Sequence, residues 1–336
     1  MSNRGSEQGV DSIRAVASFM VIVLHVAAGG FYDFDRNWFA INLYDSFVRV
    51  CVPLFLMVSG VLLLGRQEPL GRFAWRRGRR VVPALLLWSL IYAGVQVGGM
   101  PDVVGFVRRL VAGPVQYHLW YLYALIGIYA FVPVMRALHL HGSPGDNRLF
   151  LAMWALVTCI WPAAAAHFGF SYALVEVYWL HSFAGLGVYM LLGAHLREWL
   201  QPGRCWGGLL LFVLSSLAVA WMTYMRAVAA GRPDELFYAY LSPFVLSGSI
   251  GAFLFFGALP GGGGRVAAVV RLISNHSLGI FCVHVLMIDL VRDWVGLSLH
   301  SGSAWWSVPV TAVVVFTLSA AASLLLARVP LLRYTV

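Results

Sequence analysis

Ten apolar stretches, each long enough to cross a lipid bilayer, constrain the fold of this chain more than any other feature of its sequence. About 20 predominantly apolar residues are enough for a helix to span the hydrocarbon core. The connections between the stretches are short. We therefore predict an all-α polytopic membrane protein, a single integral-membrane domain over residues 1–336 with about ten transmembrane helices. The stretches lie near 12–30, 46–64, 81–99, 118–136, 149–167, 178–196, 206–225, 239–259, 273–291 and 306–327.

The overall composition supports a membrane protein. Hydrophobic residues make up 60% of the chain and charged residues only 11%, whereas about a quarter of a soluble domain is charged. The small residues after the first apolar stretch, "HVAAGG", resemble a signal-peptide cleavage site. Because that stretch is long and nine more follow it, we expect it to remain as a transmembrane helix.

The basic residues indicate a membrane topology. The formal net charge of +9 would suggest nucleic-acid binding in a soluble protein, and all 23 basic residues are arginine. With a cytoplasmic N-terminus, sixteen arginines fall on the cytoplasmic side and six in the outer connections. Positive residues concentrate on the cytoplasmic side of membrane proteins. We therefore predict that both termini are cytoplasmic, and we expect no nucleic-acid partner.

The four cysteines predict neither a disulfide framework nor a metal site. Cys51, Cys159, Cys205 and Cys282 lie in or beside apolar stretches, with no C-x-x-C or other ligand spacing. Such isolated cysteines behave as small apolar residues. We expect no metal cofactor.

Two ionisable residues in the first apolar stretch, Arg14 and His25, are a candidate site. Polar groups inside membrane spans are costly and are functional hypotheses by default. Eleven residues are almost three helical turns, so both side chains share one helix face, about 16 Å apart along the axis. The alternative is that Arg14 anchors the span at the interface and His25 makes a hydrogen bond between helices.

A second candidate is the arginine cluster "WRRGRRVVP" (Trp75–Pro83) at the start of the third stretch. The cluster could serve only to anchor the topology, or its guanidinium groups could grip phosphate oxygens bidentately. Together with Arg14 and His25 it suits coenzyme A, which carries phosphates at one end and a thioester at the tip of a thin arm. A neutral imidazole at that tip could act as a general base.

Five segments resemble the acyltransferase-3 family of integral-membrane acyltransferases. The first has an arginine and a histidine separated by ten residues, and the third has Arg-x-x-Arg before an apolar residue and proline. We align that pair on Arg77 and Arg80, which places Pro83 correctly, although Arg76 and Arg79 share the spacing. The segments are "DSIRAVASFMVIVLHV", "CVPLFLMVSGVLLL", "RRGRRVVP", "YHLWYLYALIGIYAFVPVM" and "ISNHSLGIFCVHV".

The resemblance implies transfer of an acyl group, usually acetyl from cytoplasmic acetyl-CoA, to a hydroxyl of a surface or lipid-linked glycan at the bacterial inner membrane. It implies that His25 is catalytic and that Arg14, Arg77 and Arg80 are essential and engage the donor. The expected partners are thus acetyl-CoA, a carbohydrate acceptor such as an exopolysaccharide or O-antigen unit, and the lipid bilayer. The acceptor and the oligomeric state are not defined by the sequence.

Several other polar residues have two readings each. Asp11 could orient Arg14 or cap the helix, and His118 and Trp120 could line a pocket or anchor a span. Glu176 could contact acceptor hydroxyls. Ser59 and Gly60 favour close helix packing, and a buried polar contact is expected for His284. The connection Phe31–Asp45 is expected outside the membrane, as an aromatic belt or as part of a sugar-binding mouth.

Two other functions are compatible with intramembrane Arg and His. The main alternative is a secondary transporter of a sugar or anionic substrate. Transporters often show internal repeats and broken spans at matching positions, and the sequence shows neither. A sensing protein without turnover is the third possibility.

Overall fold

The chain folds entirely into helices, as predicted. The structure is a computed structural model that describes residues 3–169, 175, 177–259, 263–330 and 332–336, and these contain no strand. The longer helices are α1 (Asn3–Ala28), α2 (Trp38–Val48), α3 (Cys51–Leu63), α4 (Leu70–Val97), α5 (Val103–Ala112), α6 (Trp120–His141), α7 (Pro144–Trp154), α8 (Trp161–Phe168), α10 (Val188–Leu196), α11 (Cys205–Ala230), α12 (Pro243–Ala258), α13 (Gly264–Asn275), α14 (Ser277–Leu290) and α15 (Ala304–Leu326).

Short helical turns join these helices or extend them. They are η1 (Tyr117–Leu119), η2 (Ala155–Ile160), η3 (Leu180–Phe183), η4 (Arg197–Trp199), η5 (Pro202–Arg204), η6 (Leu236–Tyr238), η7 (Val291–Val295) and η8 (Leu332–Tyr334).

Eight helical segments of the described chain are long and apolar enough to cross a membrane, against the ten predicted. A ninth forms if α13 and the helix after it count as one span, which bends by 74°. The stretch 178–196 differs most from the prediction, since its helix α10 has only nine residues. Positive φ angles at Trp179 and Gly185 interrupt the backbone before α10. A count of apolar residues does not detect such breaks, and a short apolar helix is typical of a buried core element.

The second span begins earlier than predicted. The helices α2 and α3 together cover Trp38–Leu63, so much of the connection expected outside the membrane is part of a span. Asp45 is fully buried and pairs with Arg49, one helical turn later. A carboxylate and a guanidinium four residues apart on a helix face each other, and their pairing reduces the cost of burying either charge.

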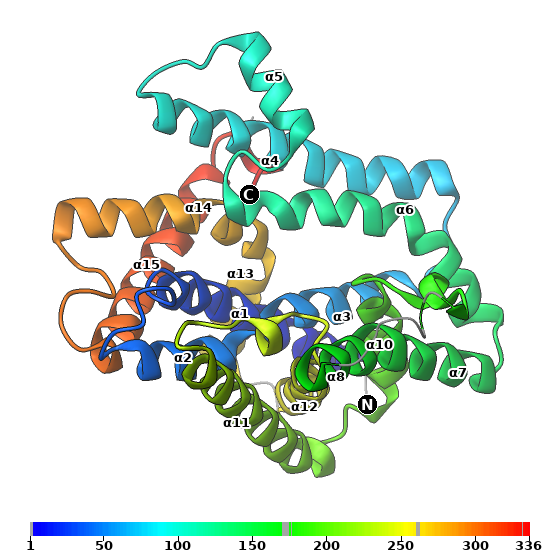
Figure 1. Cartoon of the computed structure of the whole chain (residues 1–336). Coiled ribbons are helices and arrows are strands. Elements are labelled where there is room, and N and C mark those ends of the chain that lie inside the picture. Colours follow the sequence, from blue (N-terminus) through cyan, green and yellow to red (C-terminus); the bar gives the residue numbers. More distant parts are fainter. Residues whose placement is uncertain (1–2, 170–174, 176, 260–262, 331) are drawn as a thin grey trace.

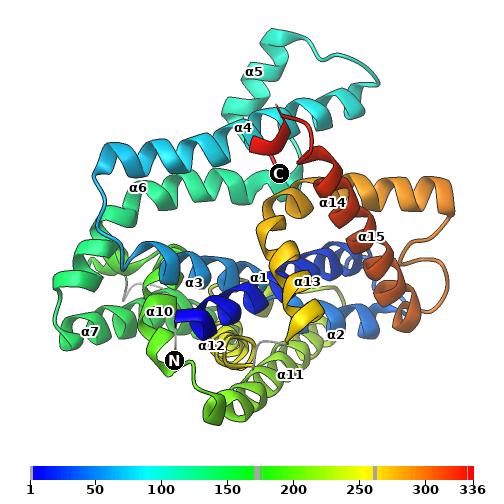
Figure 2. The same cartoon turned by 180° about the vertical axis from the view of Figure 1, so that it is seen from behind.

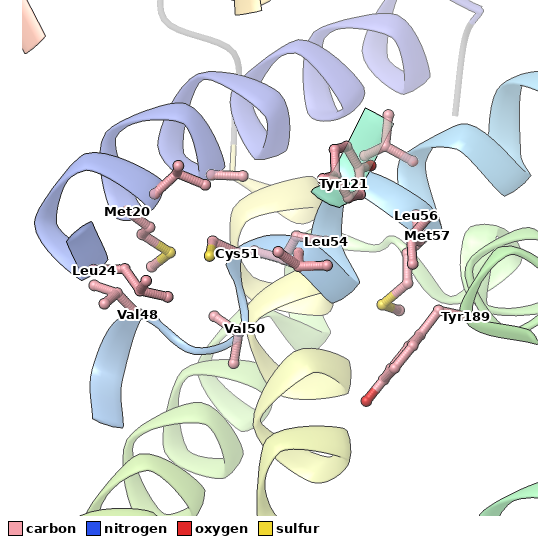
Figure 3. Close-up of a cluster of buried hydrophobic side chains, with 14 of the residues drawn as sticks. Met20, Leu24, Val48, Val50, Cys51, Leu54, Leu56, Met57, Tyr121 and Tyr189 are labelled. Atoms are coloured by element: carbon pink, nitrogen blue, oxygen red, sulfur yellow. The ribbon is translucent and has the colours of Figure 1, made fainter. Parts of the chain in front are cut away.

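Helix α1 lies in the middle of the bundle. It packs against α2, α3, α12, α13, α14 and α15. In both views the layer of α4, α5 and α6 lies on one side of α1 and the pair α11 and α12 on the other (Figures 1 and 2). Apolar side chains fill the space between α1 and the second span, among them Met20, Leu24, Val48 and Leu54 (Figure 3). The path of α1 therefore fixes where Arg14 and His25 lie.

Glycines bring α3 and α10 into direct backbone contact. A Cβ added to Gly60 would overlap the backbone of Met190, and one added to Gly193 would overlap that of Met57. Small residues allow such close approach between helices in membranes. This agrees with the interpretation of Gly60 as a packing residue. The close contact also holds the short helix α10 inside the bundle, where eight of its nine residues are buried.

The end of the chain packs against α4. The indole Nε1 of Trp88 donates a hydrogen bond to the backbone oxygen of Thr335, at 3.1 Å. The placement of the two termini on the cytoplasmic side stays a prediction.

Candidate active site

Three arginines from two helices surround one hollow. Arg14 comes from α1. Arg77 and Arg80, the pair chosen in the sequence alignment, come from the first turns of α4. The pocket has a volume of about 150 Å³. Residues of α3, α6 and α14 complete its wall. Its lining consists of Arg14, Phe55, Ser59, Leu62, Leu63, Arg77, Arg80, Val81, Tyr121, Leu125, Tyr129, Ser277, Leu278 and Phe281.

The structure separates the two possible arginine pairs. Neither Arg76 nor Arg79 lines this pocket. Arg76 lies at the surface, where its Nη1 is 3.3 Å from Glu68 Oε2. Arg79 and Arg80 are both exposed, so it is the lining of the pocket that distinguishes them. Within the described residues, no carboxylate lies within 4.0 Å of the guanidinium groups that line the pocket. Positive charge therefore converges there without an internal counter-ion, an arrangement that favours an anionic ligand.

A second, larger pocket adjoins the first. It has a volume of about 910 Å³ and shares Arg14 and Leu62 with the smaller pocket. Three further arginines line it, Arg66, Arg197 and Arg271. Its lining also includes Glu7 and Asp11, which the arginines outnumber. The two pockets together therefore give the arginine end of α1 a net positive lining.

Asp11 is linked to Arg14 through a serine of α13. Ser274 Oγ donates to Asp11 Oδ1 at 2.7 Å, and Arg14 Nη1 lies 3.5 Å from the same Oγ. Asp11 lies eight residues inside α1, which begins at Asn3. Capping of the helix is thereby excluded, and the structure favours the reading in which Asp11 helps to orient Arg14.

The other polar site on α1 is a cluster of three imidazoles. His25 Nδ1 lies 2.7 Å from His284 Nε2, on α14. The ring of His118, from η1, lies 5.0 Å from His284 and 6.3 Å from His25, between centroids. His118 and His284 are fully buried, whereas His25 is only partly buried. His118 is thus part of the bundle interior and not an interfacial anchor, and His284 makes the polar contact expected of it.

An aromatic wall separates the two sites. Phe281 lines the arginine pocket, and its ring centroid lies 5.5 Å from that of His118 and 5.8 Å from that of His284. Tyr121 also lines the pocket and contacts Phe281 edge-on. His25 itself does not line the pocket. A ligand that enters beside the arginines would meet this wall before it reached the imidazole of His25.

The comparison with family models decides what kind of protein carries this site. A model described as an acyltransferase domain matches residues 7–328, nearly the whole chain. The chain belongs to the acyltransferase-3 family. It is a membrane acyltransferase. No curated protein and no solved structure gives a match.

One polar pair of this acyltransferase was not recognised in the sequence. Asp45 and Arg49 form a buried ion pair, and the Arg49 guanidinium lies 4.2 Å from the ring centroid of Tyr238. The available signal was an acidic and a basic residue four positions apart at the edge of an apolar stretch. The assignment of Phe31–Asp45 to an outer connection hid it.

Of the remaining candidates of the acyltransferase, Ser59 lines the arginine pocket, and the others lie apart from it or outside the described residues. Trp120 stacks on Tyr240, with centroids 5.8 Å apart. Glu176 lies outside the residues that the structure describes. All four cysteines are free and buried. Across the described parts of the chain, no three His, Cys, Asp or Glu side chains are arranged to hold a metal ion.

Proposed function

We propose that this acyltransferase moves an acetyl group from cytoplasmic acetyl-CoA to a hydroxyl of a surface or lipid-linked glycan, with His25 as the general base. One observation carries the proposal. Arg14, Arg77 and Arg80 converge on a pocket where no described carboxylate pairs with them, and the same helix that supplies Arg14 carries a partly buried histidine three turns away. A phosphate-bearing donor with a reactive tip suits both ends of this arrangement.

The donor would bind from the arginine end of α1. A guanidinium group can bind two phosphate oxygens at once. The larger pocket, lined by Arg66 and Arg271, offers room for a nucleotide. The thin arm of the donor would then pass Arg14 and run along α1 toward His25. The rings of Phe281 and Tyr121 stand between the pocket and the histidines, so they would have to move aside for the arm to reach the imidazole. The separation of the two residues, about 16 Å along the helix axis, requires an extended carrier, which a free acyl phosphate would not provide.

The chemical step is acyl transfer with a proton shuttle. His25 accepts the proton of an acceptor hydroxyl as its oxygen attacks the thioester carbonyl carbon. The tetrahedral intermediate collapses, the carbon–sulfur bond breaks, and the CoA thiolate leaves. His25 returns the proton to that sulfur. The products are an O-acetyl ester and free CoA, and the imidazole ends neutral, as general acid–base catalysis requires.

The acceptor would approach from the far side of the histidine cluster. The ring of Tyr117 lies 5.4 Å from that of His25 and is 54% exposed. At the same end of α1, Tyr32 and Phe34 follow the helix and are exposed. Sugars stack on aromatic faces and bind carboxylates through their hydroxyl groups, so this aromatic and acidic surface suits a glycan better than an apolar acceptor.

Labelled acetyl-CoA tests the proposal. Membranes that contain the protein should release CoA and form a labelled glycan, and His25→Ala should lower the rate by about 10² to 10⁴, the usual value of positioned proton transfer. A transporter would instead accumulate substrate in vesicles without CoA release. Equal rates for the parent and His25→Ala, at equal membrane levels, would contradict the role of His25.

The side from which the donor enters has its own test. A reporter fused in the connection 141–147 should report a cytoplasmic location, as the arginine distribution predicts. A reporter signal from the opposite side would show that the topology is inverted. Cytoplasmic acetyl-CoA would then have no access to the arginine pocket. Localisation to the inner membrane of a bacterium is part of the same proposal.

A further inference from the structure

His284 makes two hydrogen bonds through its two ring nitrogens. Its Nδ1 lies 2.5 Å from the backbone oxygen of Phe281, three residues earlier on α14. Its Nε2 lies 2.7 Å from Nδ1 of His25. The ring is fully buried, so water does not compete for either nitrogen. Both partners of His284 are therefore protein atoms in fixed positions.

These contacts determine which nitrogen carries the proton. A carbonyl oxygen only accepts hydrogen bonds, so Nδ1 of His284 must be the protonated nitrogen. In a neutral ring the other nitrogen, Nε2, is then an acceptor. The only way to complete the contact with His25 is for His25 Nδ1 to donate. Nε2 of His25 is left without a proton, with its lone pair available to accept one.

A protonated His284 is a poor alternative. It would donate from both nitrogens and would force a neutral His25 to carry its proton on Nε2. A buried cation needs a partner of opposite charge, and within the described chain no carboxylate lies within 4.0 Å of His284. The surrounding rings are those of Phe281 and His118, which carry no compensating charge. The neutral form with the proton on Nδ1 is the arrangement that the contacts support.

We propose that His284 is a positioning residue that fixes the tautomer of His25, so that Nε2 of His25 faces the reaction as the base. The proposal rests on the proposed role of His25 in acyl transfer. When His25 takes up the acceptor proton, its Nδ1–H becomes a charge-assisted donor to His284 Nε2, and such bonds are about twice as strong as neutral ones. The same logic, a base oriented by a third group, operates in nucleophile–base–orienter triads.

The direction of the chain of hydrogen bonds is set by the backbone. In many active sites a carboxylate accepts from the base and brings a negative charge into the site. Here the terminal acceptor is the Phe281 carbonyl, which is neutral, and the relay runs from His25 through His284 to that oxygen. A buried carboxylate next to His25 is therefore not needed. Phe281 also lines the arginine pocket, so one residue contacts both sites.

Two substitutions at position 284 separate this role from packing. In His284→Gln, the amide oxygen can occupy the place of Nε2 and still accept from His25. In His284→Asn, the shorter amide reaches the Phe281 carbonyl but not His25. Both side chains are neutral and polar, so a purely structural role of His284 predicts that the two substitutions lower activity equally.

Kinetics give the first readout. We expect His284→Asn to lower kcat by about 10- to 100-fold, the worth of a hydrogen bond to a charged group, with KM for acetyl-CoA unchanged. His284→Gln should retain most of kcat. Equal kcat values for the two variants, at equal membrane levels and thermal stability, would overturn the proposal. An increase in KM without a change in kcat would do the same.

The tautomer can be measured without any substrate. In ¹⁵N-histidine-labelled protein in bilayers, the His25 signals are identified by their loss in His25→Ala. We expect a protonated Nδ1 and an unprotonated Nε2 in the parent and in His284→Gln, and a change of tautomer in His284→Asn. A protonated Nε2 on neutral His25 in the parent would overturn the proposal. Because this readout needs no turnover, an absence of CoA release would reject the proposed function while the tautomers still decide the role of His284.

Discussion

The two ends of helix α1 solve different problems with different side chains. At one end, three arginines surround a pocket of about 150 Å³, and among the residues that the structure describes no carboxylate lies within 4.0 Å of their guanidinium groups. At the other end, three imidazoles pack together, two of them fully buried. Like charges repel and remain hydrated, which favours a hollow between the arginines, whereas the imidazole rings lie close together, with centroids 4.7 to 6.3 Å apart. The difference is consistent with the proposed function, in which the arginine end binds the donor and the histidine end transfers the proton.

The strongest test of this comparison changes the helical register between Arg14 and His25. One alanine inserted after Ala17 keeps Arg14 and His25 but rotates them apart by about 100° and lengthens the helix by about 1.5 Å. We expect CoA release to fall at least 10²-fold, because His25 would lose His284. Four inserted residues restore the face to within about 40° but add about 6 Å, so little activity should return.

An alanine inserted between Gly99 and Met100, in the exposed connection between α4 and α5, is the matched control for the insertion in α1. It changes the chain length without touching the register and should leave activity near that of the parent. Parental activity in the α1 insertion, at normal membrane levels, would show that the two ends work independently.

Lysine substitutions test the arginine end, because they keep the positive charge but remove the planar guanidinium fork. In the double variant Arg77→Lys/Arg80→Lys we expect KM for acetyl-CoA to rise about 10- to 100-fold, because lysine does not replace a bidentate guanidinium fork. The control Arg76→Lys/Arg79→Lys has the same composition and spacing but lies outside the pocket, so it should change KM less than about threefold. Equal effects of the two double variants on KM would argue for topology anchoring in both.

The smallest effect is expected from the hydroxyl that supports Arg14 at the arginine end. Ser274→Ala removes the hydroxyl that connects Asp11 to Arg14. Its contact with Arg14 is long, at 3.5 Å, so we expect a loss near the typical value of about 1 kcal/mol for one hydrogen bond, which raises KM for acetyl-CoA roughly fivefold with kcat unchanged. Ser12→Ala, whose hydroxyl bonds only within α1, is the control. A fall in kcat alone would instead link Ser274 to the histidine end.

The hollow end was largely predictable from the sequence, and the packed end was not. The spacing of Arg14 and His25 places both on one helix face, and the resemblance to the acyltransferase-3 family, through the position of Pro83, singled out Arg77 and Arg80. The structure brings Arg14, Arg77 and Arg80 to one pocket. The contact of His25 with His284 joins residues 259 positions apart, and helix periodicity contains no information on such a pairing. The wall formed by Phe281 is hidden for the same reason, since its neighbours come from other helices.

The differences in the fold have a similar cause. An apolar count identifies a span by composition, but the ends of a helix depend on individual backbone angles. The break before α10 follows from positive φ angles at Trp179 and Gly185, and the break between α13 and α14 follows from the 74° bend there. Asp45 shows the opposite error. The apolar count placed this charged residue outside the span, whereas in the structure its ion pair allows it to be buried within the span.

Helix α1 runs without interruption from Asn3 to Ala28, so the distance between any two of its residues is fixed by their separation in the sequence. Each residue adds 1.5 Å and about 100°, so evolution has no continuous way to adjust the reach between the two sites. A donor with a longer or shorter carrier arm would require whole turns to be gained or lost, together with matching shifts in every helix that packs on α1. Under the proposed function, the length of the donor's carrier arm corresponds to a fixed number of residues of α1, the eleven from Arg14 to His25.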